Sequence, residues 1–138
     1  MGPVALESAT MNRDVSNGTV TVLVVDDEPL ILEMISEELT GQGFSVLEAD
    51  TGEAALSIIE SGRMFDVLFT DIRLPGEFDG WRLATTAREA KPELPVIYAS
   101  GYVVEQSAAV PGSVFLTKPY LPSTIAKTIR KLASTLGS

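Results

Sequence analysis

The chain has 138 residues, and its 10 Lys and Arg against 19 Asp and Glu leave a formal net charge of −9. This length suits one compact domain, and the negative balance argues against direct binding to nucleic acid or to an anionic membrane, since both need a basic surface. The absence of Cys and His excludes disulfides, thiolate catalysis, Ser-His-Asp triads and imidazole or thiolate metal sites, so a bound metal must be a hard cation held by oxygen.

Short apolar runs alternate with segments of helical spacing from residue 20 onward. Residues 1–18 carry no sustained period, which predicts a flexible N-terminal leader before a domain over residues 19–138. The predicted strands are 20–25, 44–47, 67–70, 95–99 and 114–117. The predicted helices are 29–42, 52–61, 80–90 and 122–136, and the helix between the last two strands should be short or absent because few residues separate them.

Helix ends can also be read from the sequence. Pro29 and Pro122 suit first helical turns, and the pair Gly41 and Gly43 suits a helix end. Asp50, followed three residues later by Glu53, has the spacing of a capping box and predicts the start of the second helix.

Strands that alternate with helices indicate right-handed crossovers in a parallel sheet. The runs at 22–25 and 67–69 are continuously apolar, as expected of strands covered on both faces. We therefore predict an α/β fold, a doubly wound three-layer (βα)5 domain with a short or irregular fourth helix, without a second domain or an internal repeat.

Polar residues follow the predicted strands where they end: Asp26 and Asp27 after the first, Asp71 after the third, Ser100 after the fourth and Lys118 after the fifth. Ligands of open parallel sheets bind beyond these carboxyl ends, so the side chains should share one edge. Neighbouring carboxylates repel one another unless a cation compensates, and without His or Cys the natural cation is Mg²⁺. The pattern indicates phosphoryl transfer onto Asp71, because a carboxylate can act as nucleophile and form an aspartyl phosphate.

Four stretches, each closing a predicted strand, carry a family resemblance. They are Val-Val-Asp-Asp-Glu-Pro at 24–29, Phe-Thr-Asp-Ile-Arg-Leu-Pro-Gly at 69–76, Tyr-Ala-Ser-Gly-Tyr at 98–102 and Phe-Leu-Thr-Lys-Pro-Tyr at 115–120. Each alone is weak, but four in order are specific. Residues 19–136 resemble the receiver domain of two-component response regulators, which implies a flavodoxin-like sheet with strand order 2-1-3-4-5.

The resemblance implies the residues that handle phosphate and metal. Asp71 would accept a phosphoryl group from a phosphohistidine on a sensor histidine kinase or histidine phosphotransfer protein. Asp26, Asp27 and Asp71 would hold Mg²⁺ together with the backbone carbonyl of Arg73. The chain would then be a signalling domain that assists its own phosphorylation, rather than an enzyme with a separate substrate.

The resemblance also implies a switch. Lys118 would bridge Asp71 or its phosphate, and the Lys118–Pro119 peptide would be cis. Ser100 would be the switch hydroxyl and Phe115 the aromatic side chain coupled to it. The phosphorylated form would then control contacts with a downstream protein target.

Three features depart from the usual receiver pattern: the loop 75–80 is one residue longer, Arg73 sits two residues beyond Asp71, and the fourth helix looks truncated. Together they resemble a subgroup found with certain alphaproteobacterial sensor kinases, either free-standing or fused behind the kinase. The departures leave the phosphoacceptor in place and change the surroundings of the switch.

Plainer interpretations exist for single residues. Asp26 and Asp27 could cap the first helix, but this leaves Asp71 and Lys118 unexplained. Ser100 with the following glycine is also an ordinary turn pair. The side chain of Phe115 suits core packing, which does not exclude a role in switching.

Other functions fit parts of the pattern. The main alternative is a small Mg²⁺-dependent phosphatase or phosphotransferase acting on a soluble metabolite through an aspartyl phosphate. A flavodoxin-like cofactor binder is disfavoured, because the acidic residues after the first strand would repel a flavin phosphate. A receiver that is never phosphorylated is disfavoured by the complete acidic set.

The sequence also leads to expectations about cellular location and assembly. No apolar run approaches the ~20 residues of a membrane span, and the N-terminus lacks the pattern of a secretory signal. We expect a cytoplasmic protein that binds neither nucleic acid nor membrane, with a homodimer as one assembly open to it.

Overall fold

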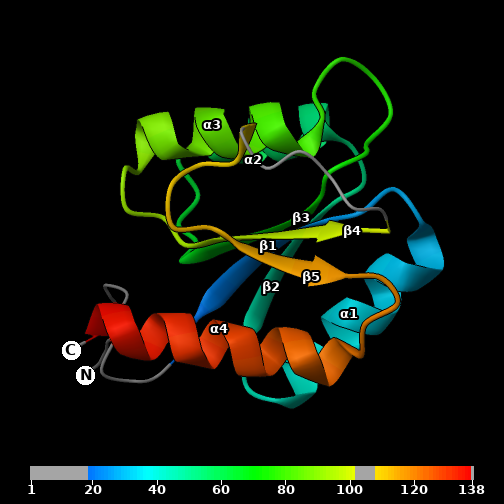
Figure 1. The fold of residues 1–138 in the computed structure, drawn as a ribbon, viewed down its shortest axis with the longest axis vertical. Coiled ribbons are helices and arrows are strands. Elements are labelled where there is room, and N and C mark those ends of the chain that lie inside the picture. The colour runs from blue at the N-terminus through cyan, green and yellow to red at the C-terminus, as the bar shows by residue number, and fades with distance from the viewer. Residues whose placement is uncertain (1–18, 102–107, 138) are drawn as a thin grey trace, which may run out of the picture.

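The computed structural model describes residues 19–101 and 108–137, with side chains up to residue 132. Five parallel strands form one sheet in the order β2-β1-β3-β4-β5 (Figure 1). The strands are β1 (Thr21–Val25), β2 (Ser45–Ala49), β3 (Val67–Asp71), β4 (Val96–Ser100) and β5 (Val114–Thr117). The helices are α1 (Pro29–Gly41), α2 (Gly52–Glu60), α3 (Gly80–Ala90) and α4 (Pro122–Gly137). The predicted fold and strand order are confirmed.

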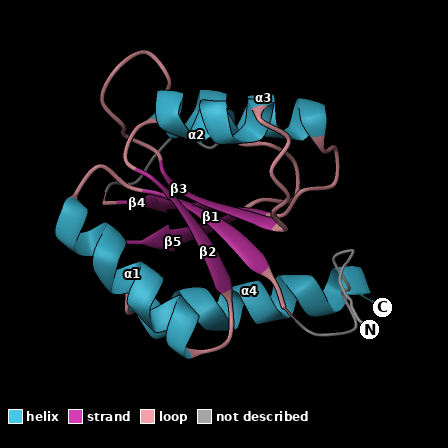
Figure 2. Ribbon diagram, turned by 180° about the vertical axis from the view of Figure 1, so that it is seen from behind, coloured by secondary structure: helices cyan, strands magenta, loops and turns pink. Residues whose placement is uncertain are grey.

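Helices cover both faces of the sheet. Figure 2 shows α2 and α3 on one side of the strands and α1 and α4 on the other. The interior strand β1 contributes to both cores, since Leu23 and Val25 pack under α2 and α3 while Val22 and Val24 pack under α1 and α4. All four side chains are fully buried, which explains why this strand is continuously apolar in sequence.

The start of α2 differs from the prediction. The N-cap is Thr51, whose Oγ1 accepts a hydrogen bond of 2.9 Å from the backbone N–H of Ala54. The prediction of a capping box that begins at Asp50 is therefore wrong. Threonine is also a favoured N-cap, and here it is the residue in extended conformation next to the helix. The Glu53 carboxylate instead accepts a hydrogen bond of 3.1 Å from the N–H of Glu77, and this bond holds the long loop after β3.

The start of α3 closes that loop. Asp79 is the N-cap, and its Oδ1 accepts a hydrogen bond of 2.9 Å from the N–H of Arg82. Gly80 lies so close to the end of β3 that a Cβ built on it would stand 2.2 Å from the backbone oxygen of Asp71. A side chain at position 80 would therefore displace the strand end that carries Asp71.

The connection between β4 and β5 holds no α-helix in its described residues, which are 101 and 108–113. The predicted short helix and the predicted leader over 1–18 fall largely or wholly on residues outside the described ranges. Within those ranges, none of the helices has the length and apolar character needed to cross a bilayer.

Candidate functional site

Three carboxylates gather where β1 and β3 end. Asp26 and Asp27 follow β1, Asp71 is the last residue of β3, and the two strands are neighbours in the sheet. One carboxylate oxygen from each residue lies within 4.8 Å of the other two. Asp26 and Asp71 are only 1% and 5% exposed, whereas Asp27 is open to solvent. The predicted convergence of these residues is found.

The donor atoms of this acidic cluster fit a hard divalent cation. Asp26 accepts a hydrogen bond of 2.9 Å from the backbone N–H of Glu28 through Oδ1, but its Oδ2 is buried and has no partner among the described residues. A buried, unpartnered carboxylate oxygen is costly unless a cation or a donor satisfies it. Carboxylate oxygens that converge in this way match the preference of Mg²⁺ or Ca²⁺ for oxygen ligands.

The electrostatics of the cluster follow from burial. Burial raises the pKa of Asp26 to about 6, with the nearby charge of Asp71 acting in the same direction and the Glu28 N–H acting against it. Burial also raises the pKa of Asp71, although the hydrogen bond and charge of Lys118 oppose this. Both carboxylates are therefore destabilised as anions, and a bound cation would relieve that penalty.

Lys118 reaches the cluster from the end of β5. Its Nζ forms an ion pair of 2.7 Å with Oδ1 of Asp71, and its side chain is 29% exposed. Burial alone would lower the pKa of Lys118, but the carboxylate of Asp71, followed by those of Asp26 and Glu28, holds it above the ordinary value. The Lys118–Pro119 peptide is cis, as the family resemblance implied.

A cavity of about 460 Å³ opens in front of these side chains. Besides Asp27, Asp71 and Lys118, its lining includes Arg73 and Ser100. A backbone hydrogen bond of 2.8 Å from the N–H of Lys118 to the oxygen of Ser100 ties the ends of β4 and β5 together at its rim. Five of the residues predicted from sequence therefore face one space large enough for a phosphoryl group.

Phe115 lies apart from the acidic cluster, in an aromatic layer under α3. Its ring centroid is 5.1 Å from that of Tyr98 and 5.9 Å from that of Trp81. The fully buried Tyr98 ring lies between strand and helix, and its hydroxyl accepts a hydrogen bond of 3.2 Å from the backbone N–H of Val110. Trp81 packs α3 against the sheet through these rings, and the role of Tyr98 in holding the β4–β5 connection was not predicted.

Arg88 of α3 holds the same connection. Its Nε donates to the backbone oxygen of Leu94 at 2.6 Å, and its guanidinium also donates to the oxygen of Pro111 at 2.8 Å. A basic residue in the last turn of a helix is commonly assigned to the helix dipole, so the sequence contains no signal for this contact.

The comparison with known protein families agrees with this geometry. Residues 22–130 match the family described as the response regulator receiver domain. The chain belongs to this family. Its role is accordingly that of a receiver domain in two-component signalling.

Individual relatives support the assignment. The chain is 31% identical over 136 residues to the sensor kinase CckA of Brucella abortus, covering 94% of this chain but 14% of the kinase. Among solved structures, it resembles a response regulator receiver protein from Sinorhizobium medicae with a TM-score of 0.79 and 35% identity, over 83% of this chain and 94% of that one. It also resembles the response regulator TrrA of Thermotoga maritima, solved in complex with Mg²⁺ and BeF, with a TM-score of 0.70 and 30% identity over 82% and 98% of the two chains.

Proposed function

We propose that Asp71 is the phosphoacceptor of this receiver domain and that Asp26, Asp27 and Asp71 hold the Mg²⁺ that phosphoryl transfer requires, with the backbone carbonyl of Arg73. The observation that carries the proposal is the ion pair between Lys118 and Asp71 beside two further carboxylates, at the mouth of a cavity. The Mg²⁺ complex of the related receiver TrrA supports this choice of metal.

The contacts of Asp71 and Lys118 support a chemical role for each side chain. Lys118 holds Oδ1 of Asp71, which leaves the second carboxylate oxygen to attack the phosphorus atom. The new O–P bond forms as the bond from phosphorus to the donor's leaving atom breaks, and the leaving group departs with the electron pair of that bond. Lys118 is then placed to transfer its hydrogen bond from Asp71 to a phosphoryl oxygen. A bound Mg²⁺ would supply charge neutralisation to the carboxylates and the phosphoryl oxygens.

The donor follows from the family. We infer that a histidine kinase or a histidine phosphotransfer protein supplies the phosphoryl group, because the chain matches part of a sensor kinase as well as a response regulator receiver protein. Glu28 and Lys118 line both the cavity at Asp71 and a neighbouring apolar groove beside α1, so a partner seated on this groove would border the phosphoacceptor. The output is then a contact with a downstream protein, and turnover of a separate substrate is not expected.

The switch is proposed to run from Ser100 to Phe115. A phosphoryl group adds about −1.5 to −2 charges next to Lys118 and Ser100. Both residues sit at the tied ends of β4 and β5, and Phe115 lies two residues from the end of β5 in the aromatic layer. A shift of these strand ends would therefore reach the surface formed by α3 and the β4–β5 connection.

Acetyl phosphate with Mg²⁺ tests the phosphoacceptor. The wild-type chain should gain one phosphoryl group by intact-mass spectrometry, and chelation of Mg²⁺ should abolish the gain. Asp71→Asn should take up none, because an amide oxygen is a poor nucleophile, whereas the matched control Asp50→Asn at an exposed position should behave as wild type. Uptake of the same label by Asp71→Asn would refute the assignment. Sustained hydrolysis of a small phosphoester would instead favour the alternative, a Mg²⁺-dependent phosphatase.

A further inference from the structure

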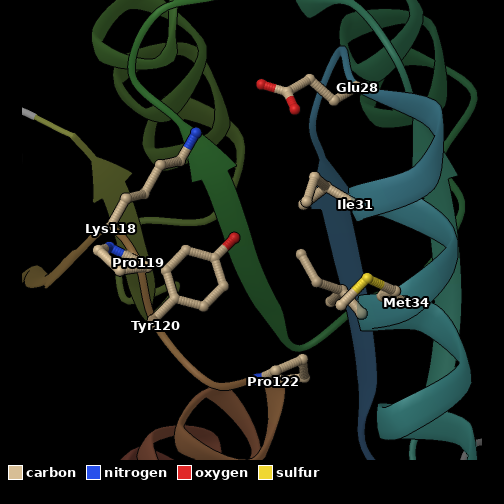
Figure 3. A pocket seen from close by; sticks show the side chains of 8 residues that line it. Glu28, Ile31, Met34, Lys118, Pro119, Tyr120 and Pro122 are labelled. Atoms are coloured by element: carbon tan, nitrogen blue, oxygen red, sulfur yellow. The ribbon is translucent and has the colours of Figure 1, made fainter.

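The side chain of Tyr120 lies in an environment that the proposed function does not explain. Tyr120 follows Lys118 and Pro119, and its ring stands edge-on to Phe69 of β3, with centroids 5.8 Å apart and an interplanar angle of 84°. Together with Ile31 and Met34 of α1 it lines an apolar groove of about 320 Å³. Figure 3 shows its hydroxyl turned away from Pro119 and toward the α1 side of this groove.

The Tyr120 hydroxyl is buried and has no hydrogen-bond partner among the described residues. A buried phenol usually finds a partner, because its O–H loses the hydrogen bond that water would supply. The same is true of Asp26 Oδ2, which is also buried and unpartnered. One atom is a donor and the other an acceptor, and solvent reaches neither of them.

The sheet places these two groups on the same face, because Phe69 pairs with Val24 of β1 and Asp26 follows Val24 by two residues. Burial raises the pKa of the Tyr120 phenol, and among the charges that raise it further Asp26 acts most strongly, before Asp71 and Glu28. A phenol surrounded by carboxylates keeps its proton and remains a donor. Among the described residues, a third buried polar atom, Ser36 Oγ of α1, also has no hydrogen-bond partner.

We propose that Tyr120 is a positioning residue for the metal site, whose hydroxyl donates a direct hydrogen bond to the Asp26 carboxylate when the acidic cluster holds its cation. The inference rests on the proposed metal site and adds a residue to it. Neither group has a hydrogen-bond partner among the described residues, so the proposed bond would satisfy both.

The chemistry of metal ligands gives this bond a function. An ionised carboxylate oxygen can accept a hydrogen bond and still coordinate a cation with its remaining lone pairs. Hydrogen bonds to ligating carboxylates fix the orientation of the ligand, and their loss typically weakens metal binding about 10- to 100-fold. Asp26 is fixed on its other oxygen by the N–H of Glu28, so a donor at Oδ2 would hold the carboxylate from both sides.

Tyr120→Phe isolates the hydroxyl, because phenylalanine keeps the ring and its edge-on contact with Phe69. We expect Mg²⁺ to bind about tenfold more weakly to Tyr120→Phe than to wild type in calorimetric titrations. The Mg²⁺-induced rise in melting temperature should shrink accordingly, while the melting temperature without Mg²⁺ should not fall. A side chain that only packs would leave both Mg²⁺ readouts unchanged.

Tyr98→Phe is the matched control, since it removes the same hydroxyl from a tyrosine buried in the aromatic layer instead of the groove. It should bind Mg²⁺ as wild type does. Equal Mg²⁺ affinity in wild type and Tyr120→Phe, or an equal loss in both variants, would overturn the inference while leaving the metal site standing. A wild-type chain that binds no Mg²⁺ would overturn the metal site, and this inference with it.

Discussion

The acidic cluster and the aromatic layer occupy the same sheet, but their buried polar groups are satisfied to different degrees. In the aromatic layer, the hydroxyl of Tyr98 accepts a hydrogen bond from Val110, and Arg88 holds the neighbouring connection. In the acidic cluster, Asp26 keeps a buried oxygen that has no partner in the described part of the chain, and the pKa values of Asp26 and Asp71 are raised mainly by burial. The hydroxyl of Tyr98 and the guanidinium of Arg88 therefore have partners, whereas the acidic cluster carries excess negative charge that a cation can neutralise.

Removal of the buried negative charge of Asp26 should change stability more than the other tests described below. Asp26→Asn should raise the free energy of unfolding of the Mg²⁺-free protein by about 1–3 kcal/mol near pH 7.5, since the pKa of Asp26 is raised by burial to about 6 from 3.8. The same variant should lose the stabilisation by Mg²⁺. Urea denaturation with and without Mg²⁺ measures both effects.

The control for this measurement is Asp50→Asn, which makes the same chemical change at an exposed residue and should alter neither quantity. If Asp26→Asn were instead clearly destabilising without Mg²⁺, the carboxylate would already be satisfied in the folded protein. The contrast between the acidic cluster and the aromatic layer would then be wrong.

The pH dependence of stability is a second test of the difference between the acidic cluster and the aromatic layer. A carboxyl group whose pKa is higher in the folded than in the unfolded chain favours folding while it is protonated, and this contribution disappears as the pH rises. For Asp26 the loss should occur between about pH 4 and its folded pKa of about 6. The Mg²⁺-free protein should therefore lose stability over this interval, and the difference from Asp26→Asn should grow over it and stay constant above it.

Mg²⁺ binding should show the opposite trend. Because a proton and the cation compete for the Asp26 carboxylate, Mg²⁺ affinity should fall as the pH is lowered through about 6. Calorimetric titrations from pH 5 to 8 would measure this. An affinity independent of pH over that range would show that Asp26 stays ionised throughout.

Most of the fold and of the acidic cluster could be predicted from the sequence because both depend on local patterns. The continuous apolar runs of β1 and β3 reflect burial on both faces, and the polar residue that ends each run marks the edge of the sheet. The parallel topology then brings Asp26 and Asp71 together without further information.

The missed features depend on contacts that no local pattern encodes. Asp50 and Thr51 are both good N-caps, and only the path of the backbone into α2 selects Thr51. The hydrogen bond of Tyr98 joins β4 to Val110 within the β4–β5 connection, and the environment of Tyr120 is set by Phe69 and by α1. An aromatic residue after Lys-Pro was visible in the sequence, but its unsatisfied hydroxyl became apparent only in three dimensions.

A fluorescence experiment, with the weakest signal of those described, tests whether the acidic cluster and the aromatic layer communicate. Trp81 is the sole tryptophan of the chain, and its ring lies 4.8 Å from Tyr98 and 5.9 Å from Phe115, so its fluorescence reports on the aromatic layer. Acetyl phosphate with Mg²⁺ should shift the Trp81 emission of the wild-type chain. Ser100→Ala should still gain the phosphoryl group by mass but show a reduced shift, because the hydroxyl that would draw the end of β4 toward the phosphate is missing. A full shift in Ser100→Ala would mean that the aromatic layer responds without Ser100, and an absent shift in phosphorylated wild type would mean that it does not respond at all.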